Sequence, residues 1–333
     1  MPIARSVKPI ASLSLDVDNK WSYLKTHGDP GWESFPSYLD ILVPRVLEFL
    51  AKRNLTITFF VVGQDAALAK NSAAVQMIAA AGHEIGNHSF SHEPWLSQYS
   101  REEVEREIVL AEEQITRIAG QRPVGFRGPG FNLSEAALDV LRDRGYLYDA
   151  STLPTFLGPL ARAYYFLHSH LRGEELNRRK SLFGSIRDGF RPLKPYRWQT
   201  SDGLLEIPLT TMPIIRSPIH MSYLLYLSTF SRSLALGYFQ AALRLCRLCG
   251  ISPSLLLHPL DFLGRDDEVG LEFFPAMSLT REQKLRVLSE TLAMYCSQFQ
   301  VVTLEEHARS VTEHYPTNVV GHYLTDSVLS LDE

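Results

Sequence analysis

The strongest constraint on the fold of this chain is a repeated alternation of strand-like and helix-like segments. The run IASLSLD (10–16) is rich in β-formers and ends in an acid, and TITFFVV (56–62) is β-branched and aromatic throughout. Further strand-like runs follow at 83–87, 123–126, 204–207, 254–258 and 300–304. Several of these runs are apolar without alternation, which is typical of parallel strands buried on both faces.

The segments between these runs carry the start and stop signals of helices. Ser100 and Glu103 form a capping-box pattern ahead of apolar residues at helical spacing, and Gly120 marks the stop. Similar signals mark two further helices. Thr280 and Gln283 form a capping-box pattern at the start of 281–297, and another helix begins after Ser134 and ends at Gly145. Pro44 fits the first position of a helix that runs through Lys52. The alternation predicts a parallel α/β fold, closed as a barrel or wound open.

The composition narrows the class of protein. Apolar residues make up 45% and charged residues 21% of the 333 residues, as in a globular chain of one large domain. A net charge of −4 gives no reason to expect a nucleic-acid partner. Three cysteines are too few and too odd in number for a disulfide framework. These features predict a cytoplasmic protein with reduced thiols.

The sequence shows no signal-peptide core near its start, and its most apolar stretch, 221–246, is interrupted by Arg232 and Arg244. We expect a buried or interfacial helix there rather than a spanning one. The location predicted from these features is the cytoplasm, with a peripheral position on the inner face of the membrane as an option. The oligomeric state stays open.

One segment departs from the alternation. Residues 156–198 carry nine basic against three acidic residues, with aromatic residues interleaved. We interpret the segment as an insertion or cap within a single domain that spans 1–333. A solvated face with a small core of its own explains this composition, and so does a patch for an anionic lipid or a phosphate-bearing substrate.

Acidic and histidine residues gather at the ends of predicted strands. Asp16 and Asp18 end the first strand, and His88 and His92 follow the strand-like run at 83–87. In parallel α/β folds, the carboxyl ends of the strands meet on one face, where active sites form. Two imidazoles and one carboxylate suit zinc or another divalent transition ion with open positions. If 88–92 winds as a helical turn, both rings point the same way.

Two further strings fit the same face. GFRGPGF (125–131) places Arg127 just after a strand, and LLLHPLDF (255–262) ends an apolar strand in His258. A histidine at that place is a candidate general acid, with a carbonyl-bonded core histidine as the alternative. Arg127 is equally compatible with a structural ion pair. In the loop 203–224, Arg216 and His220 are candidate substrate contacts, although the prolines there also suit an ordinary turn.

The order of these motifs resembles the polysaccharide deacetylase family, also called the NodB-homology or carbohydrate esterase family 4 domain. The strings that carry the resemblance are SLDVDNK, HSFSHEP, FRGPGF, YDAST and LLLHP, over about 10–150 and 200–305. The resemblance implies a distorted (β/α) barrel with fewer than eight complete units. It also implies one divalent metal ion, for which we expect zinc, with cobalt, nickel or iron as alternatives.

The resemblance implies a role for each matching residue. Asp18, His88 and His92 would be the metal ligands. Asp16 would be the general base, and Arg127 would orient it. His258 would protonate the leaving nitrogen, and Asp149 of YDAST would tune that histidine. The backbone N–H of Gly130 would stand where an oxyanion donor is needed.

Three departures from the family pattern affect the substrate. The usual adjacent acid pair is here Asp16-Val17-Asp18, the aromatic residue that often follows R-x-P is Gly130, and no Trp follows Asp149. The last two changes remove aromatic surface on which a sugar ring would stack, so they disfavour a chitin-like polymer.

We therefore expect a metal-dependent amide hydrolase that removes an N-acyl group, acetyl or formyl, from an amino sugar. A nucleotide-linked or lipid-linked sugar in glycan biosynthesis would fit. One alternative is a cyclic amide or ureide hydrolase on the same scaffold, which needs no sugar platform. The other is a catalytically silent protein that binds a glycan or a lipid headgroup.

Overall fold

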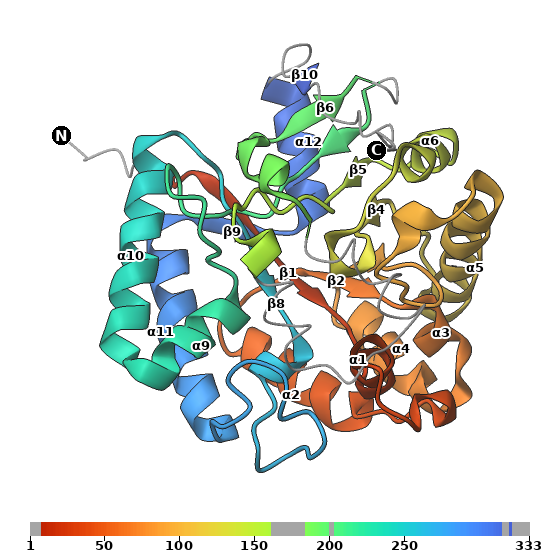
Figure 1. Ribbon diagram of the computed structural model, residues 1–333, viewed down its shortest axis with the longest axis horizontal. Coiled ribbons are helices and arrows are strands. Elements are labelled where there is room, and N and C mark those ends of the chain that lie inside the picture. Colours follow the sequence, from red (N-terminus) through yellow and green to blue (C-terminus); the bar gives the residue numbers. More distant parts are fainter. Residues whose placement is uncertain (1–7, 161–183, 200–202, 315–319, 322–333) are drawn as a thin grey trace, which may run out of the picture.

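A single curled sheet forms the centre of the molecule (Figure 1). The computed structural model describes residues 8–160, 184–199, 203–314 and 320–321. The strands of these residues are β1 (Ile10–Asp16), β2 (Thr58–Val61), β3 (Glu84–Asn87), β4 (Gly125–Phe126), β5 (Tyr148–Asp149), β6 (Tyr196–Trp198), β7 (Leu205–Glu206), β8 (Ser254–Leu257), β9 (Gln300–Val302) and β10 (Val320–Gly321). Their order is β10-β6-β7-β5-β4-β3-β2-β1-β8, with β9 paired to β1.

The sheet is parallel apart from the antiparallel pair β6 and β7. The gap between β7 and β8 is bridged by one residue rather than by strand pairing: Thr210 donates its N–H to the Ser254 carbonyl, and its hydroxyl accepts the Ser254 N–H. The expected distorted parallel barrel is therefore confirmed, with one mixed pair and incomplete closure.

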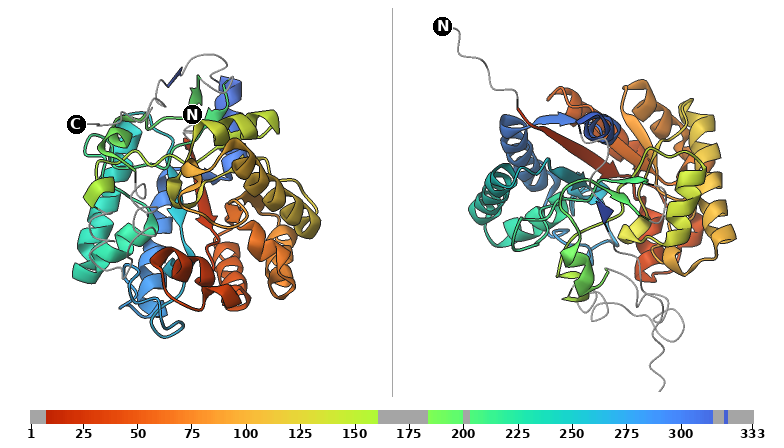
Figure 2. Two further views of the ribbon diagram at one scale, coloured as in Figure 1. Left: turned by 45° about the vertical axis from the view of Figure 1, so that its right-hand side comes forward. Right: turned by 90° about the horizontal axis from the view of Figure 1, so that it is seen from above.

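Helices cover the outside of the sheet on two sides (Figures 1 and 2). They are α1 (Lys20–His27), α2 (Leu39–Ala51), α3 (Gly63–Ala67), α4 (Ser72–Ala80), α5 (Arg101–Ala119), α6 (Glu135–Asp143), α9 (Met221–Phe230), α10 (Arg232–Leu248), α11 (Arg281–Gln298) and α12 (Leu304–His314). In Figure 1, α9, α10 and α11 lie on one side of β1 and β8, and α3 to α6 lie on the other. Within the described residues, no helix is long and apolar enough to cross a membrane.

Strand β1 shows why the predicted strands form where they do. It coincides with the predicted run 10–16, and all of its residues after Ile10 are buried. Since β1 lies between β2 and β8 in a curled sheet and is buried after Ile10, its first acidic side chain comes where the strand ends, at Asp16.

The predicted capping boxes are also present. Ser100 and Glu103 exchange side-chain and backbone bonds at the start of α5, and Gly120 ends it with a left-handed φ of 74°. Thr280 and Gln283 do the same at the start of α11. These local pairs fix where the two longest described helices begin, and so which of their faces meets the sheet.

The predicted start of a helix at Pro44 is wrong. Helix α2 begins at Leu39, so Pro44 lies inside it. Two polar side chains fix the earlier start, because the Asn19 oxygen accepts the Tyr38 N–H and the Ser37 hydroxyl accepts the Leu39 N–H. A proline in this position removes one hydrogen bond of the helix, and the buried apolar face of α2 outweighs that loss.

The interpretation of 156–198 as an insertion or cap stays a prediction, and residues 161–183 lie outside the described residues. Of the described part, Tyr196–Trp198 forms β6 and joins the central sheet beside β7. Phe156 packs edge-to-face against Phe190 at a centroid distance of 5.0 Å, which gives this segment an aromatic contact of its own.

Candidate active site

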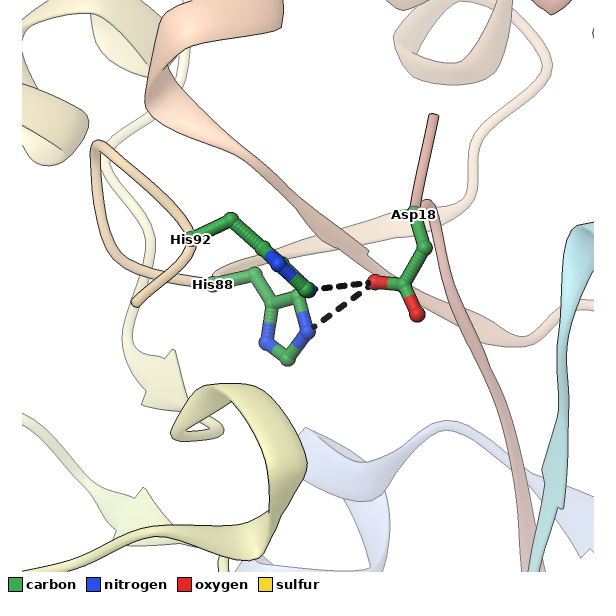
Figure 3. Close-up of side chains that lie close together, drawn as sticks. All are labelled: Asp18, His88 and His92. Atoms are coloured by element: carbon green, nitrogen blue, oxygen red, sulfur yellow. Dashed lines mark hydrogen bonds and ion pairs between the residues drawn. The ribbon is translucent and has the colours of Figure 1, made fainter. Parts of the chain in front are cut away.

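The carboxyl ends of β1 and β3 bring together the three expected metal ligands. Asp18 lies two residues beyond β1, and His88 directly follows β3. Asp18 Oδ1 is 3.3 Å from His88 Nε2 and 3.0 Å from His92 Nε2, and all three residues are buried (Figure 3). One ligand atom from each lies within 4.8 Å of the others. A carboxylate and two imidazoles at this separation are a donor set that fits zinc or a neighbouring divalent ion.

The orientation of His88 supports this fit. Its Nδ1 lies 2.6 Å from the carbonyl oxygen of Arg127, which can only accept a hydrogen bond. Nδ1 therefore carries the proton, and Nε2, the atom that faces Asp18, has its lone pair free for a metal. This second hydrogen bond is the usual way in which a metal-binding histidine is held in the correct tautomer.

Residues 88–92 do not form a helical turn, which was the condition given for both rings to point the same way. Ser89 and His92 both have left-handed backbone conformations, with φ of 58° and 51°. The bend still brings the two rings together, at a centroid distance of 5.2 Å. Such strained conformations persist only where surrounding contacts hold them, and they gather at functional sites.

Those contacts come from α5 and from the first turn of α3. Glu107 accepts hydrogen bonds from the N–H groups of Phe90 and Ser91, at 3.0 and 2.7 Å. The N–H groups of Gly63 and Gln64 donate to the carbonyls of Ser89 and Phe90. Sequence analysis did not identify Glu107, because nothing in the local pattern of α5 links it to a loop about 16 residues earlier.

Hydrogen bonds from neighbouring residues fix the backbone at Asp18. The Tyr38 hydroxyl donates to the Asp18 carbonyl at 2.6 Å, and Asn19 caps α1 immediately after it. Burial alone would raise the pKa of Asp18, but the charge of His92 and the bonds from both imidazoles hold it well below its usual value. The carboxylate is thus in the ionised form that a metal requires.

Asp16 and Arg127 form a buried ion pair beside this group. Arg127 Nη1 donates to Asp16 Oδ1 at 2.6 Å and to the Ser14 hydroxyl at 2.8 Å, and Nε donates to the Ala150 carbonyl at 2.9 Å. The guanidinium is fully buried and lies over the Phe60 ring. The two residues expected to act as base and orienting cation are therefore in direct contact.

Gly130 lies in the turn that follows Arg127. Its φ is 60°, and a Cβ at this position would lie 3.0 Å from the Cβ of Pro94. The hydrogen bonds of the turn are donated by Phe131 and Asn132, so they do not use the Gly130 N–H. A left-handed, closely packed position explains why glycine replaces the larger residue expected here.

His258 directly follows β8 and lies at the start of the 3-10 helix Pro259–Asp261. Its Nδ1 is 3.0 Å from the Ser222 hydroxyl, which in turn donates to Asp261 at 2.8 Å. The role of Asp149 in tuning His258 stays a prediction. The described contacts of Asp149 are with Ser151 and with Glu206, its register partner on β7.

Tyr23 connects the two halves of the site. Its ring packs edge-to-face on Phe274 at 5.2 Å, and Phe274 lies 6.3 Å from the His258 ring. Burial, and then the charges of nearby acids that include Asp18, Asp261 and Asp16, raise the pKa of Tyr23 well above its usual value. The metal-ligand group and the histidine at β8 thus share one neighbourhood, and sequence analysis did not identify Tyr23.

The two residues expected to contact substrate have different surroundings. The His220 ring lies 6.1 Å from the His258 ring, and burial followed by the charge of His258 lowers the pKa of His220 to about 3. Arg216 donates to the carbonyl of Arg191 at 3.0 Å, so at least this guanidinium nitrogen holds two loops together. Contact of either residue with substrate stays a prediction.

Comparison with known proteins confirms the resemblance stated from the motifs. Residues 30–148 match the family described as polysaccharide deacetylase. The chain is 34% identical over 104 residues to a peptidoglycan-N-acetylglucosamine deacetylase of Bacillus cereus, covering 31% of this chain and 37% of that protein. It is 27% identical over 151 residues to a peptidoglycan deacetylase of Helicobacter pylori, covering 43% and 50%. The aligned parts thus span half or less of the length of these two relatives.

Solved structures extend the likeness of fold to almost the whole chain. A structure from Mycobacterium smegmatis described as a polysaccharide deacetylase has a TM-score of 0.61 at 20% identity, covering 97% of this chain and 98% of that one. One from Pseudomonas aeruginosa has a TM-score of 0.59 at 17% identity, covering 94% and 93%. These two likenesses concern the fold, whereas the match to the polysaccharide deacetylase family covers residues 30–148, with His88, His92 and Arg127 inside the matched segment and the acids of β1 outside it.

Proposed function

We propose that this chain is a metal-dependent hydrolase that removes the acetyl group from an N-acetylated amino sugar. The observation that carries the proposal is the buried group of Asp18, His88 and His92 beside the Asp16–Arg127 pair. A metal ligand set next to a fixed carboxylate is what hydrolysis of an unactivated amide requires. The names of the relatives, which act on N-acetylglucosamine or on peptidoglycan, supply the substrate class.

Asp18, His88 and His92 would hold the metal ion, for which we propose zinc. When bound, such an ion acts as a Lewis acid that lowers the pKa of a water and polarises the amide carbonyl. Asp16 takes a proton as the water attacks, and Arg127 keeps that carboxylate in place. The Gly130 N–H donates to the oxygen that becomes negative, a contribution of about 3 kcal/mol in comparable sites.

His258 completes the hydrolysis. The C–N bond breaks as the protonated ring of His258 gives a proton to the leaving nitrogen, so that an amine departs rather than an amide anion. The products are acetate and the free amino sugar, and the hydroxyl added to the acyl carbon comes from the attacking water. A formyl group is the alternative to acetyl, and a nucleotide-linked or lipid-linked sugar is supported by the basic and aromatic composition of 156–198.

The first experiment measures metal content and acetate release together. The zinc-reconstituted protein and its Asp18→Ala, His88→Ala and His258→Ala variants are analysed by plasma mass spectrometry, then incubated with N-acetylated chitooligosaccharides and with a cyclic imide. We expect about one equivalent of metal in the unaltered protein and in His258→Ala, and loss of metal in the other two variants.

We expect acetate release to fall by about 10²- to 10⁴-fold in His258→Ala, the range that a lost general acid produces. Near-normal turnover in this variant would remove His258 from the role of acid. Hydrolysis of the imide alone would favour a cyclic amide hydrolase on this scaffold. Failure to bind metal after reconstitution would refute the hydrolase mechanism and leave a silent binding protein.

A further inference from the structure

The surroundings of His258 assign two residues that neither the motifs nor the comparisons point to. Ser222, the second residue of α9, and Asp261, at the end of the short helix after β8, are both buried. They lie 36 and 3 residues from His258 in the chain, and they contact its ring and its backbone respectively.

The hydrogen bonds to Asp261 determine where the hydroxyl proton of Ser222 points. Asp261 Oδ2 accepts the backbone N–H of His258 at 2.7 Å, and Oδ1 lies 2.8 Å from the Ser222 oxygen. Since a carboxylate can only accept, the single hydroxyl proton of Ser222 points to Asp261. The Ser222 oxygen is then left as an acceptor toward His258 Nδ1, 3.0 Å away.

This arrangement fixes the tautomer of the imidazole. We propose that Ser222 and Asp261 are positioning residues that hold a proton on His258 Nδ1, so that Nε2 is the nitrogen that gains and gives the catalytic proton. The proposal rests on the proposed function only in taking His258 as the general acid. The same logic operates where a carboxylate orients a catalytic histidine directly, but here a hydroxyl stands between the two groups.

Contacts around Asp261 explain why the hydrogen bonds that link Asp261, Ser222 and His258 are stable. Lys284 of α11 is fully buried and donates to the carbonyls of Leu260 and Leu263 at 2.7 and 2.8 Å. These two bonds hold the backbone on either side of Asp261. Burial raises the pKa of Asp261, although the charge of His258 and the two bonds to its oxygens oppose that rise.

The other titratable groups that face this chain of bonds come from three elements. His220 precedes α9, and its ring lies 6.1 Å from the His258 ring. Lys284 of α11 and Tyr23 of α1 both interact with the charge of Asp261. His220 is a neutral neighbour above pH 5, because its pKa is lowered to about 3.

The consequence for the reaction is a single productive form of the ring. The imidazolium has protons on both nitrogens, and transfer from Nε2 to the leaving nitrogen leaves the neutral ring with its proton on Nδ1. That neutral form already matches the Ser222 oxygen, so no ring flip or tautomer exchange is needed. Solvent then returns a proton to Nε2.

The test reads the proton positions directly. The zinc-reconstituted chain is labelled with ¹⁵N-histidine, and the two ring nitrogens of His258 are followed by long-range ¹H–¹⁵N spectra from pH 5 to 9, assigned by comparison with His258→Gln. We expect neutral His258 to carry its proton on Nδ1. In Ser222→Ala we expect the neutral ring to become a mixture of the Nδ1–H and Nε2–H tautomers.

Two matched variants separate positioning from general structure. Ser222→Thr keeps the hydroxyl and should restore the Nδ1–H form. Ser228→Ala removes a hydroxyl from the same helix, where Ser228 donates to the Leu225 carbonyl, and should leave His258 unchanged. A neutral His258 that carries its proton on Nε2, or one that is unaltered in Ser222→Ala, would overturn the proposal.

Kinetics supply a second and separable readout. With an acetylated sugar as substrate, Ser222→Ala should lower kcat with little change in KM, whereas Ser222→Thr should restore kcat. If no acetylated sugar is hydrolysed by the metal-loaded protein, the proposed function fails, while the nuclear magnetic resonance result still decides the role of Ser222 and Asp261.

Discussion

Arg127 shows how a single buried charge organises the edge of the sheet. Its side chain crosses from the end of β4 to the end of β1, where it bonds to Ser14 and Asp16, and its Nε holds the Ala150 carbonyl after β5. Three strand ends are thereby tied to one guanidinium. A structural ion pair and an orienting cation were alternative interpretations of Arg127, and this geometry is compatible with both at once.

We predict that Arg127→Met destabilises the fold by about 3–5 kcal/mol, because the Asp16 carboxylate would be left buried without its partner. The double variant Asp16→Asn with Arg127→Met should recover part of this loss. Urea unfolding of the metal-free proteins measures the free energy of unfolding in each case.

The matched control is Arg101→Met, since Arg101 pairs with Asp143 where both side chains are 45% exposed. Its loss should stay below about 1 kcal/mol, as is usual for surface ion pairs. An Arg127→Met variant as stable as this control would show that the buried pair contributes little to the fold.

At the scale of elements, the loop that carries His92 depends on a helix that contributes no ligand. Glu107 on α5 accepts two N–H groups of this loop, and the backbone at Ser89 and His92 is left-handed. Without an acceptor on α5, these conformations would relax toward the favoured regions of backbone space.

We therefore predict that Glu107→Ala weakens metal binding by about 10- to 100-fold, the range typical of lost outer-shell partners. Glu107→Gln retains one acceptor oxygen, so its metal affinity should fall less than that of Glu107→Ala. Competition with a chelator of known affinity measures the dissociation constant. Equal metal affinity in Glu107→Ala and the unaltered protein would mean that the loop holds its conformation by other contacts.

Sequence patterns predicted the long elements well because their causes are local. Strand β1 is buried on both sides, and its apolar run shows this directly. The capping boxes of α5 and α11 lie within four consecutive residues. Strands β5, β6 and β10 were missed, since each is only two or three residues long and is defined by its neighbours in the sheet rather than by its own composition.

The residues of the candidate site also differ in how far the local sequence predicts them. Asp16, His88 and His258 could be named because each lies at or directly after the end of a recognisable strand. Ser222 could not, because its link to His258 joins residues 36 apart across two elements. Asp149 was assigned to His258 by resemblance, but on this sheet its register partner on β7 is Glu206, and the two buried carboxyl groups bond to each other.

At the scale of the whole molecule, the chain returns to its first strand near its C-terminal end. Strand β9 pairs with β1, and His307 of α12 places its Nδ1 3.0 Å from the Ser12 hydroxyl. His307 is fully buried, and burial lowers its pKa to about 4. This contact couples the closure of the fold around β1 to the protonation of one imidazole.

The sign of the resulting pH dependence follows from the two pKa values. Unfolded His307 takes up a proton near pH 6.5, whereas the folded protein takes it up only near pH 4. Between these values the unfolded state binds more protons, so the stability present above pH 6.5 is lost as the pH falls toward 4. The slope from this one group approaches about 1.4 kcal/mol per pH unit.

We predict that His307→Asn removes this part of the pH dependence, because the amide has no proton to gain. Urea unfolding of the metal-free protein at intervals from pH 7 to pH 4 should give two curves that converge as the pH falls, with the difference between them shrinking by about 3 kcal/mol. Val311→Ala, a packing variant on the same helix, should lower stability by a constant amount at every pH. Curves for His307→Asn that run parallel to those of the unaltered protein would show that His307 titrates alike in both states, and that burial does not keep the ring neutral.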